Sequence, residues 1–202
     1  MKHPLSTMSV VAMMAAMTLT VSHTTAAQAE DKTPPLPVVS SVDLTKYAGK
    51  WYEIARIDHR FQKDCVNSTA EYELRDDGDI KVTNRCDVIG KEKTKEAVGR
   101  AWVVDKDTNS KLKVQFILTF LKLPFLSGNY WVIDLDEDYK VAVVGDPSRK
   151  YLWILSRTPT LPQEQIDALT TKAVQLGYDL TDIIYNRDLR ERQHASLETN
   201  RD

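Results

Sequence analysis

Eight short segments rich in β-forming residues follow one another along this chain, with turns or loops between them. They cover residues 50–58, 66–75, 80–87, 94–104, 111–118, 129–136, 139–145 and 151–157. The pair around the turn at residues 76–79 is the clearest, because Tyr72 and Val82 belong to runs in which apolar and polar residues alternate. No helical pattern interrupts the series. The sequence therefore predicts an all-β barrel or sandwich, and not a parallel sheet with crossover helices.

A single helix is predicted after the strands, at residues 163–176. Pro162 lies in its first turn, Glu164 is near its positively polarised end, and Gly177 ends it. One face of the helix is apolar and consists of Ile166, Leu169, Ala173 and Leu176. Such a face packs against a core, so we expect the helix to lie on the outside of the barrel. Residues 181–185 could add one edge strand.

The first 29 residues have the features of a secretory signal peptide. Lys2 gives an early positive charge, residues 8–21 form a short apolar run, and Ala27-Gln28-Ala29 is a small-x-small cleavage site. The run is too short and wrongly flanked for a membrane-spanning helix. The sequence thus predicts an exported protein whose mature chain starts near Glu30.

The rest of the chain divides into three parts. Residues 30–38 contain three prolines and are expected to form an extended lead-in. Residues 39–185 hold all the predicted strands and the helix, and form the expected domain. The tail at residues 186–202 is rich in charged residues and is expected to be disordered.

Charge and residue usage exclude several functions. Lysine and arginine number 27 and aspartate and glutamate 29, interleaved and without a basic block, so no nucleic-acid partner is predicted. His59 is the only histidine outside the signal peptide and the tail, and with Asp58 it is most simply a solvated loop pair. With no His or Cys cluster, phosphate loop or dinucleotide motif, the sequence predicts no metal, no cofactor and no enzyme activity.

Two motifs far apart in the chain carry a family resemblance. Asp43 can cap a short helical turn, and Gly49-Lys50-Trp51 leads from that turn into the first strand. Gly145-Asp146-Pro147 precedes the last strand, Tyr151-Leu-Trp-Ile-Leu-Ser-Arg157. In this order the motifs resemble those of the lipocalin family, in particular the branch with the bacterial lipocalins of the Blc type and apolipoprotein D. The resemblance implies an eight-stranded up-and-down antiparallel β-barrel with one C-terminal α-helix packed outside.

The same resemblance gives structural roles to Gly49, Trp51 and Arg157. Trp51 would close one end of the barrel, and Arg157 would lay its guanidinium across the indole from outside. Arginine stacks well on tryptophan and can donate to carbonyls of the preceding turn. The alternative is an unrelated core tryptophan and a surface arginine.

Cys65 and Cys86 are the only cysteines in the chain. An even count in an exported protein favours a disulfide, which would lie at the open rim of the barrel. The alternative is a reactive thiol, as in an enzyme branch of the lipocalins, although no histidine is near either cysteine in sequence.

An eight-stranded barrel has room inside for one small ligand, and one parity of each strand lines that interior. In the apolipoprotein D-like relatives the tryptophan that corresponds to Trp153 points inward, which fixes the parity of the last strand. The predicted wall of the ligand site consists of Tyr72, Phe116, Tyr130, Val132, Tyr151, Trp153 and Leu155.

The facing of residues 129–136 is the weakest part of this assignment. Tyr130 and Val132 are expected to face inward by the same analogy, with Trp131 and Ile133 outward under the helix. Asp134 would then share the inward parity, and a carboxylate is unexpected in an apolar cavity.

Residues 116–126 are too apolar for an ordinary surface loop, yet Pro124 interrupts any strand there. In the barrel they would form a lip at the open mouth, suited to meet a membrane surface or to shield an entering acyl chain. Alternatively, Phe120, Leu123 and Phe125 fold back into the core.

The resemblance implies a protein that binds an amphipathic lipid, such as a fatty acid or lysophospholipid, for envelope lipid storage or maintenance. Each buried methylene of the acyl chain would contribute about 0.8 kcal/mol. The alternatives are another cargo such as a tetrapyrrole, sterol or siderophore, a cavity-thiol enzyme, and a filled barrel with a structural role. Transient membrane contact and a homodimer through outward apolar residues are left open.

The expected location follows from the signal segment. Bacterial relatives are often lipoproteins anchored through a cysteine at the cleavage site, but residues 1–29 contain no cysteine. We therefore expect a soluble periplasmic or secreted protein, with peripheral attachment at the outer membrane as the alternative.

Overall fold

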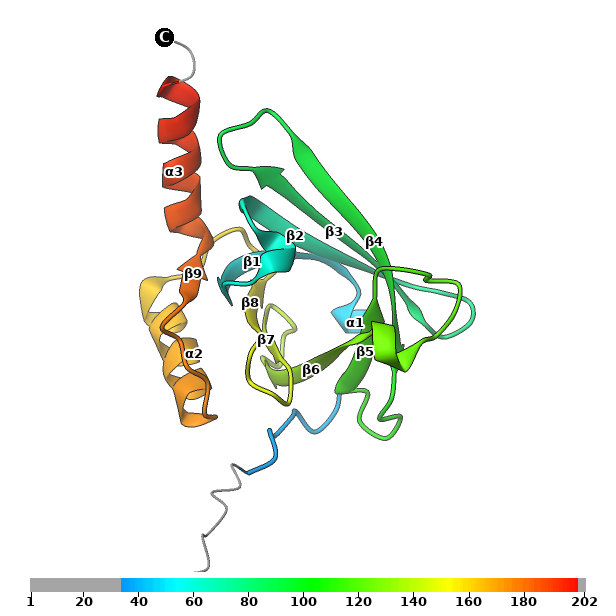
Figure 1. Ribbon diagram of the computed structural model, residues 1–202. Coiled ribbons are helices and arrows are strands. Elements are labelled where there is room, and N and C mark those ends of the chain that lie inside the picture. The colour runs from blue at the N-terminus through cyan, green and yellow to red at the C-terminus, as the bar shows by residue number, and fades with distance from the viewer. Residues whose placement is uncertain (1–33, 200–202) are drawn as a thin grey trace, which may run out of the picture. The chain divides into compact units, whose positions relative to one another are not determined.

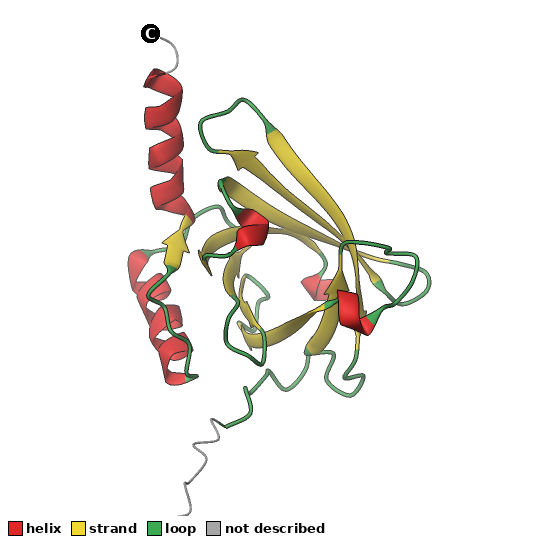
Figure 2. Ribbon diagram, viewed as in Figure 1, coloured by secondary structure: helices red, strands yellow, loops and turns green. Residues whose placement is uncertain are grey.

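The structure is a computed structural model that describes residues 34–199. The predicted signal peptide, its predicted cleavage site and the start of the expected lead-in lie outside these residues. One sheet closed into a barrel dominates the described part, with two longer helices on its outer side (Figure 1 and Figure 2).

Eight antiparallel strands form the barrel wall. They are β1 (Gly49–Ile57), β2 (Cys65–Leu74), β3 (Ile80–Val88), β4 (Thr94–Val103), β5 (Lys111–Gln115), β6 (Gly128–Leu135), β7 (Val141–Gly145) and β8 (Leu152–Ser156). Each strand pairs with the next in sequence, and β1 pairs with both β2 and β8, so the sheet closes on itself. This confirms the predicted up-and-down barrel. A ninth strand, β9 (Ile183–Tyr185), pairs with the end of β1 as the expected edge strand.

A one-turn helix, α1 (Leu44–Tyr47), covers one end of the barrel. The Asp43 side chain accepts hydrogen bonds from the backbone N–H groups of Thr45 and Lys46 and so caps its N-terminus. The Asp43 N–H in turn donates to the Tyr139 hydroxyl in the loop between β6 and β7. We call this end the closed end. The up-and-down topology places the loops after β1, β3, β5 and β7 at the other, open end.

Helix α2 (Gln163–Gln175) packs on the outer face of the sheet, as predicted. Its buried residues Ile166 and Ala173 join an outer cluster with Ile133, Val143 and Ile154. The lead-in contributes to this cluster too, because Leu36 is buried there. In the described part of the lead-in, residues 34–38 form no helix or strand, and Leu36 packs against the barrel.

A β-bulge settles the facing of strand β6. Val132 is fully buried in the inner cluster, and Ile133 belongs to the outer cluster under α2. The register then shifts between Val132 and Asp134, so that Asp134 does not continue the inward parity. Its carboxylate lies 2.6 Å from the Lys172 ammonium on α2, and Leu135 returns to the inner cluster. The expectation that Asp134 faces inward is thus wrong, because the bulge adds one residue.

The expectation of a disordered tail also needs correction, since Asn186–Thr199 forms helix α3 (Figure 1). The Asn186 side chain accepts from the Asn67 N–H and donates to the Glu53 carbonyl, which ties the helix start to β1 and β2. Leu189 is buried, and Gln193 accepts from the Gly90 N–H in the loop after β3. These contacts outweigh the charged composition of the segment, because most of its charged residues are exposed.

Candidate functional site

The closed end is sealed by the Trp51–Arg157 pair. Trp51 has no solvent exposure, and its indole N–H donates to the Tyr47 carbonyl at 2.8 Å. The guanidinium of Arg157 lies 3.8 Å from the centre of the Trp51 ring. Its N–H groups donate to the carbonyls of Lys46, Tyr47, Ala48, Lys50 and Tyr139. The pair therefore joins α1, β1 and the loop after β6, in the geometry that the family resemblance implies.

Three tyrosines cross the lumen directly inside Trp51, and we call them the tyrosine trio. The Tyr130 hydroxyl lies 2.8 Å from that of Tyr47 and 2.9 Å from that of Tyr72. Tyr72 and Tyr130 come from β2 and β6, which stand on opposite sides of an eight-stranded barrel. The ring of Tyr47 contacts both Trp51 and Tyr72. The trio thus forms a floor across the barrel.

Burial controls the ionisation of these hydroxyls. Loss of hydration raises the pKa of Tyr72 to about 12, and it raises the pKa of Tyr47 and Tyr130 well above the ordinary value. The interactions of Tyr130 with Tyr47 and Tyr72 raise its pKa further. All three groups therefore keep their protons at neutral pH and can act as hydrogen-bond donors.

The predicted wall residues occupy two levels of the barrel. Val132, Leu155 and Tyr72 are buried in the inner cluster, which also contains Trp51, Val82, Leu112 and Val144. Tyr130 and Trp153 pack against this cluster but keep partial solvent exposure. Solvent thus reaches inward-facing aromatic side chains, and the inner surface they belong to is mostly apolar.

Tyr151 and Trp153 lie nearer the open end, with two residues that sequence reasoning missed. Their rings stack at 6.1 Å, and the His59 ring stands edge-on to both at 5.6 and 5.3 Å. Phe61 extends the group and is mostly exposed. We call these four residues the mouth cluster. A loop sequence gives no periodic signal for such contacts, because they depend on where the loop lies in space.

His59 is therefore not the solvated loop residue that the sequence suggested. Both of its ring nitrogens are buried within the mouth cluster. Burial, together with the positive charge of Arg56, lowers the pKa of His59 to about 4. The imidazole is neutral at neutral pH and behaves as one more ring of the cluster.

A buried polar network underlies the mouth cluster. Arg56 donates to one oxygen of Glu53 at 2.5 Å, and the Gln62 amide donates to the other at 2.6 Å. The Trp153 indole N–H donates to the Gln62 side-chain oxygen at 2.8 Å, which fixes the direction of the indole. Glu53 and Arg56 are 4% and 2% exposed, so their charges are compensated within the network. Glu53 shares the strand parity of Trp51, which is the sequence signal that could have identified it.

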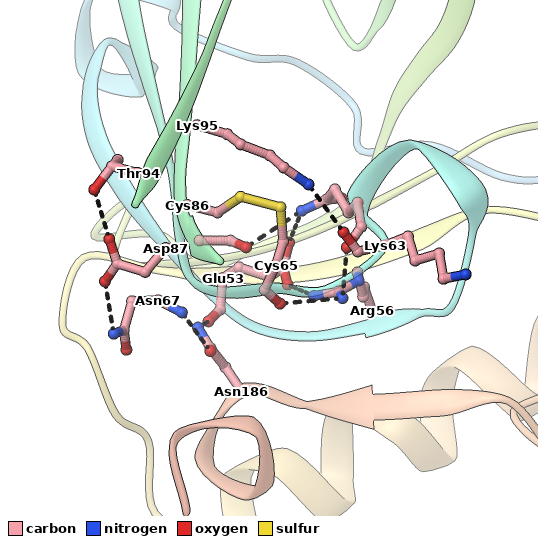
Figure 3. Close-up of a disulfide and its surroundings, with 12 residues drawn as sticks. Glu53, Arg56, Lys63, Cys65, Asn67, Cys86, Asp87, Thr94, Lys95 and Asn186 are labelled. Carbon is pink, nitrogen blue, oxygen red and sulfur yellow. Dashed lines mark hydrogen bonds and ion pairs between the residues drawn. A yellow bond between two sulfur atoms is a disulfide. The ribbon is translucent and has the colours of Figure 1, made fainter. Parts of the chain in front are cut away.

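The predicted disulfide between Cys65 and Cys86 is confirmed, and it lies beside this network (Figure 3). It joins the start of β2 to the end of β3. Arg56 also donates to the Cys65 carbonyl, as drawn in Figure 3. Neither sulfur is free, so the cavity-thiol enzyme considered above has no thiol nucleophile.

Residues 116–126 form an exposed apolar lip. Phe120 and Phe125 are 73% and 80% exposed, which excludes the alternative that they fold back into the core, while Leu123 is half-buried. Phe116, predicted in the ligand wall, is 39% exposed, and its ring occupies the space next to the Cα of Gly99 on β4. The sequence therefore predicted the apolar character of the lip but left its position open.

One buried side chain, Gln115, holds the lip in shape. Its amide nitrogen donates to the carbonyls of Ile117, Leu118 and Leu121, and its oxygen accepts from the Leu123 N–H. These bonds turn the chain out of the sheet, which explains why β5 ends at Gln115 and not at residue 118 as predicted. Nothing in the sequence pattern marks this glutamine.

Two hollows lie outside the barrel and touch none of the predicted wall residues. The larger, about 250 Å³, lies between β1, β2 and α3 and includes Tyr52, Ser68 and Arg190 in its lining. A smaller one of about 70 Å³ lies next to it and is lined by Ile54, Leu161 and Arg187, among others. Within residues 34–199, no three His, Cys, Asp or Glu side chains come together as a metal site would need. No helix in this range is both long and apolar enough to span a membrane.

An eight-stranded antiparallel barrel, closed at one end by tryptophan and arginine and reached by solvent inside, defines a class of single-lumen barrel proteins. Comparison with known proteins gives the family. The lipocalin-like domain model matches residues 42–188. This chain belongs to the lipocalin family. The match ends within the first turn of α3, so most of that helix lies outside the matched range.

Individual relatives agree with this assignment. The chain is 42% identical over 148 residues to outer membrane lipoprotein Blc of Vibrio cholerae, covering 73% of this chain and 83% of the relative. It is 32% identical over 145 residues to apolipoprotein D of Rattus norvegicus, covering 68% and 72%. The structure of insecticyanin from the tobacco hornworm Manduca sexta matches with a TM-score of 0.59 and 23% identity, covering 76% of this chain and 84% of the other, which supports the fold alone.

Proposed function

We propose that this protein binds an amphipathic lipid, such as a fatty acid or lysophospholipid, in the barrel lumen. The observation that carries the proposal is the mostly apolar inner surface between the tyrosine trio and the mouth cluster, which solvent reaches at Tyr130 and Trp153. Burial of methylene groups on that surface would contribute about 0.8 kcal/mol for each group. The closed end blocks passage beyond Trp51, so the ligand enters and leaves by the open end.

The open end suits the polar head of such a ligand. Tyr151 and Trp153 present aromatic faces there, and Trp153 is oriented by Gln62. Aromatic rings with a polar edge favour positions where an apolar chain meets water. The acyl chain would lie below these rings and the head group would stay among them.

The apolar lip indicates where the protein would take up its lipid. Phe120 and Phe125 are exposed on a loop whose shape Gln115 holds, and Lys122, between them in sequence, is ion-paired with Asp79 at 2.7 Å. Exposed apolar residues gathered on one loop are typical of a surface that touches a membrane or another protein. Transient contact of the lip with the envelope membrane would let a lipid pass without entering water. A second copy of the chain is the alternative partner for the lip.

Native mass spectrometry of the oxidised mature protein tests the function. We expect lipid that co-purifies and is displaced by added fatty acid, whereas a tetrapyrrole or sterol mass would favour another cargo. The same spectra report whether the protein is a dimer.

A pair of tryptophan variants tests the location. Ala70→Trp places a large ring inside the barrel and should weaken fatty-acid binding at least about tenfold by filling the lumen. Val98→Trp adds the same ring at an exposed position on β4 and should leave binding unchanged. Equal binding by both variants would contradict a ligand in the lumen.

A further inference from the structure

The tyrosine trio has more hydroxyl protons than it has hydrogen bonds between its own hydroxyl groups. Three hydroxyl groups supply three O–H donors, while the trio has two internal bonds, Tyr47 to Tyr130 and Tyr130 to Tyr72. Each internal bond uses one proton. One O–H is therefore donated outside the trio, in a region where the surrounding inner cluster is apolar. A buried donor is costly unless an acceptor meets it, so the floor of the barrel favours an oxygen or nitrogen acceptor.

Tyr130 is the hydroxyl best placed to offer that proton. It stands at the centre of the trio, so it can accept from both Tyr47 and Tyr72 and donate its own proton upward. Tyr130 is the least buried residue of the trio: it is half-buried, whereas Tyr47 and Tyr72 are 5% and 7% exposed. A ligand that enters from the open end would therefore meet Tyr130 before the other two tyrosines.

The acceptor that fits this position is neutral. A carboxylate at the floor would lose its hydration without an ion-pair partner, because Arg157 lies on the far side of the Trp51 ring with its N–H groups given to backbone carbonyls. A hydroxyl, keto or ester oxygen loses far less hydration on burial.

We propose that the tyrosine trio binds a neutral oxygen atom at the deep end of the ligand. The ligand class is then an acyl chain that carries a hydroxyl or keto group near the end remote from its head group. This inference rests on the proposed lipid-binding function and narrows it. A lumen that binds only plain acyl chains does not need a hydrogen-bond donor at its floor. The donor of the tyrosine trio would bind one oxygen atom of the ligand and so favour ligands that carry such an oxygen.

Matched ligands test the inference. Affinities of the wild-type protein are measured by calorimetry for straight-chain fatty acids and for ω-hydroxy fatty acids of the same lengths. The added hydroxyl weakens binding to an apolar pocket, since it must lose its hydration. Here we expect the reverse, with the ω-hydroxy acid of the best-fitting length bound about tenfold more tightly than its plain counterpart.

A variant without hydroxyls separates the trio from the rest of the lumen. The triple substitution Tyr47→Phe, Tyr72→Phe and Tyr130→Phe keeps all three rings and removes donors and acceptors together, which is often close to neutral for stability. The ratio of its affinities for the two acids should fall to that of an apolar pocket, so that the preference for the ω-hydroxy acid is lost. Tyr185→Phe on β9, outside the lumen, is the control and should keep the preference.

Each result decides between the two proposals. A wild-type preference for the ω-hydroxy acid that the triple variant lacks supports the oxygen site. A wild-type protein that binds the plain acid equally well or better overturns the oxygen site and leaves the lipid-binding function intact. A preference that survives in the triple variant also overturns it. No binding of either acid overturns the proposed function itself. The wild-type comparison alone is decisive if the triple variant does not fold.

Discussion

The two ends of this barrel are built in opposite ways. At the closed end, Trp51 is fully buried and Arg157 binds five backbone carbonyls, so every contact ties one part of the scaffold to another. At the open end, single side chains such as Gln62 and Gln115 hold loops in shape, and the aromatic side chains of Phe120 and Phe125 are 73% and 80% exposed. The comparison assigns stability to the closed end, and leaves the open end free for the proposed ligand and membrane contacts.

The sharpest way to test this division is to remove Arg157. Arg157→Ala loses the contact with Trp51 and all the carbonyl bonds, and should lower the free energy of unfolding by roughly 3–4 kcal/mol. Urea unfolding measures this, and lipid affinity measured below the transition should be nearly unchanged. Arg149→Ala is a matched control, because Arg149 binds the carbonyls of Leu176 and Pro34 without covering a buried ring. If Arg157→Ala had normal stability but no longer bound lipid, the closed end would serve binding and not stability, which would contradict this division.

The disulfide is the main covalent support of the open half. Cys65 and Cys86 are 21 residues apart, so the bond should contribute about 3 kcal/mol by restricting the unfolded chain. Replacing both cysteines with alanine, or reducing the wild type, should lower stability by this amount. A reductant should have no further effect on the double variant. An unchanged midpoint after complete reduction would contradict a stabilising role.

Removal of Gln115 should act locally. Gln115→Leu leaves three carbonyls and one N–H of the lip without their partner and should cost about 2 kcal/mol. Hydrogen exchange should speed up at residues 116–123 and stay slow in β7. Vesicle binding should weaken if the shape of the lip matters, whereas the exposed Gln175→Leu control should change neither. Loss of protection throughout the barrel would show that the lip is part of the core scaffold.

The smallest effect is expected from the pH dependence of His59. Its pKa is about 4 in the folded protein and near 6.5 when unfolded, so the unfolded state takes up the proton first as pH falls. The stabilisation is complete above about pH 6.5 and is lost as the pH falls towards about 4. Since the ring keeps some solvent contact, we expect a loss of about 1–2 kcal/mol. Chemical unfolding at several pH values measures it, and His59→Phe should flatten the curve in this window.

How much the sequence could predict depends on the range of the interactions. Alternation within strands predicted an all-β barrel or sandwich and the opposite facing of Val132 and Ile133, because it is a local property of the backbone. The same rule failed at Asp134, since a bulge leaves no trace in the alternation that precedes it. The closed end came from the family resemblance and not from periodicity.

Features that depend on side chains meeting across the fold were not predictable in this way. The tyrosine trio joins α1, β2 and β6, and no spacing rule links Tyr47 to Tyr130. Helix α3 was missed because, of its buried residues Asn186, Leu189 and Gln193, only Leu189 is apolar, although their i, i+3 and i+7 spacing was a helical signal.

The closure of the sheet between β1 and β8 has a consequence for how the protein forms. Glu53 pairs with Leu155, and Arg157 must reach Trp51, so the first strand finds half of its partners only when the last strand is available. Contacts between residues so distant along the chain slow folding, because the entropy of a long loop must be lost before these contacts form and stabilise the fold. During synthesis the β1 edge that pairs with β8 would therefore stay unpaired until residue 157 has left the ribosome. Proteins in this condition depend on delayed folding or on chaperones, and truncations before β8 should aggregate and not fold.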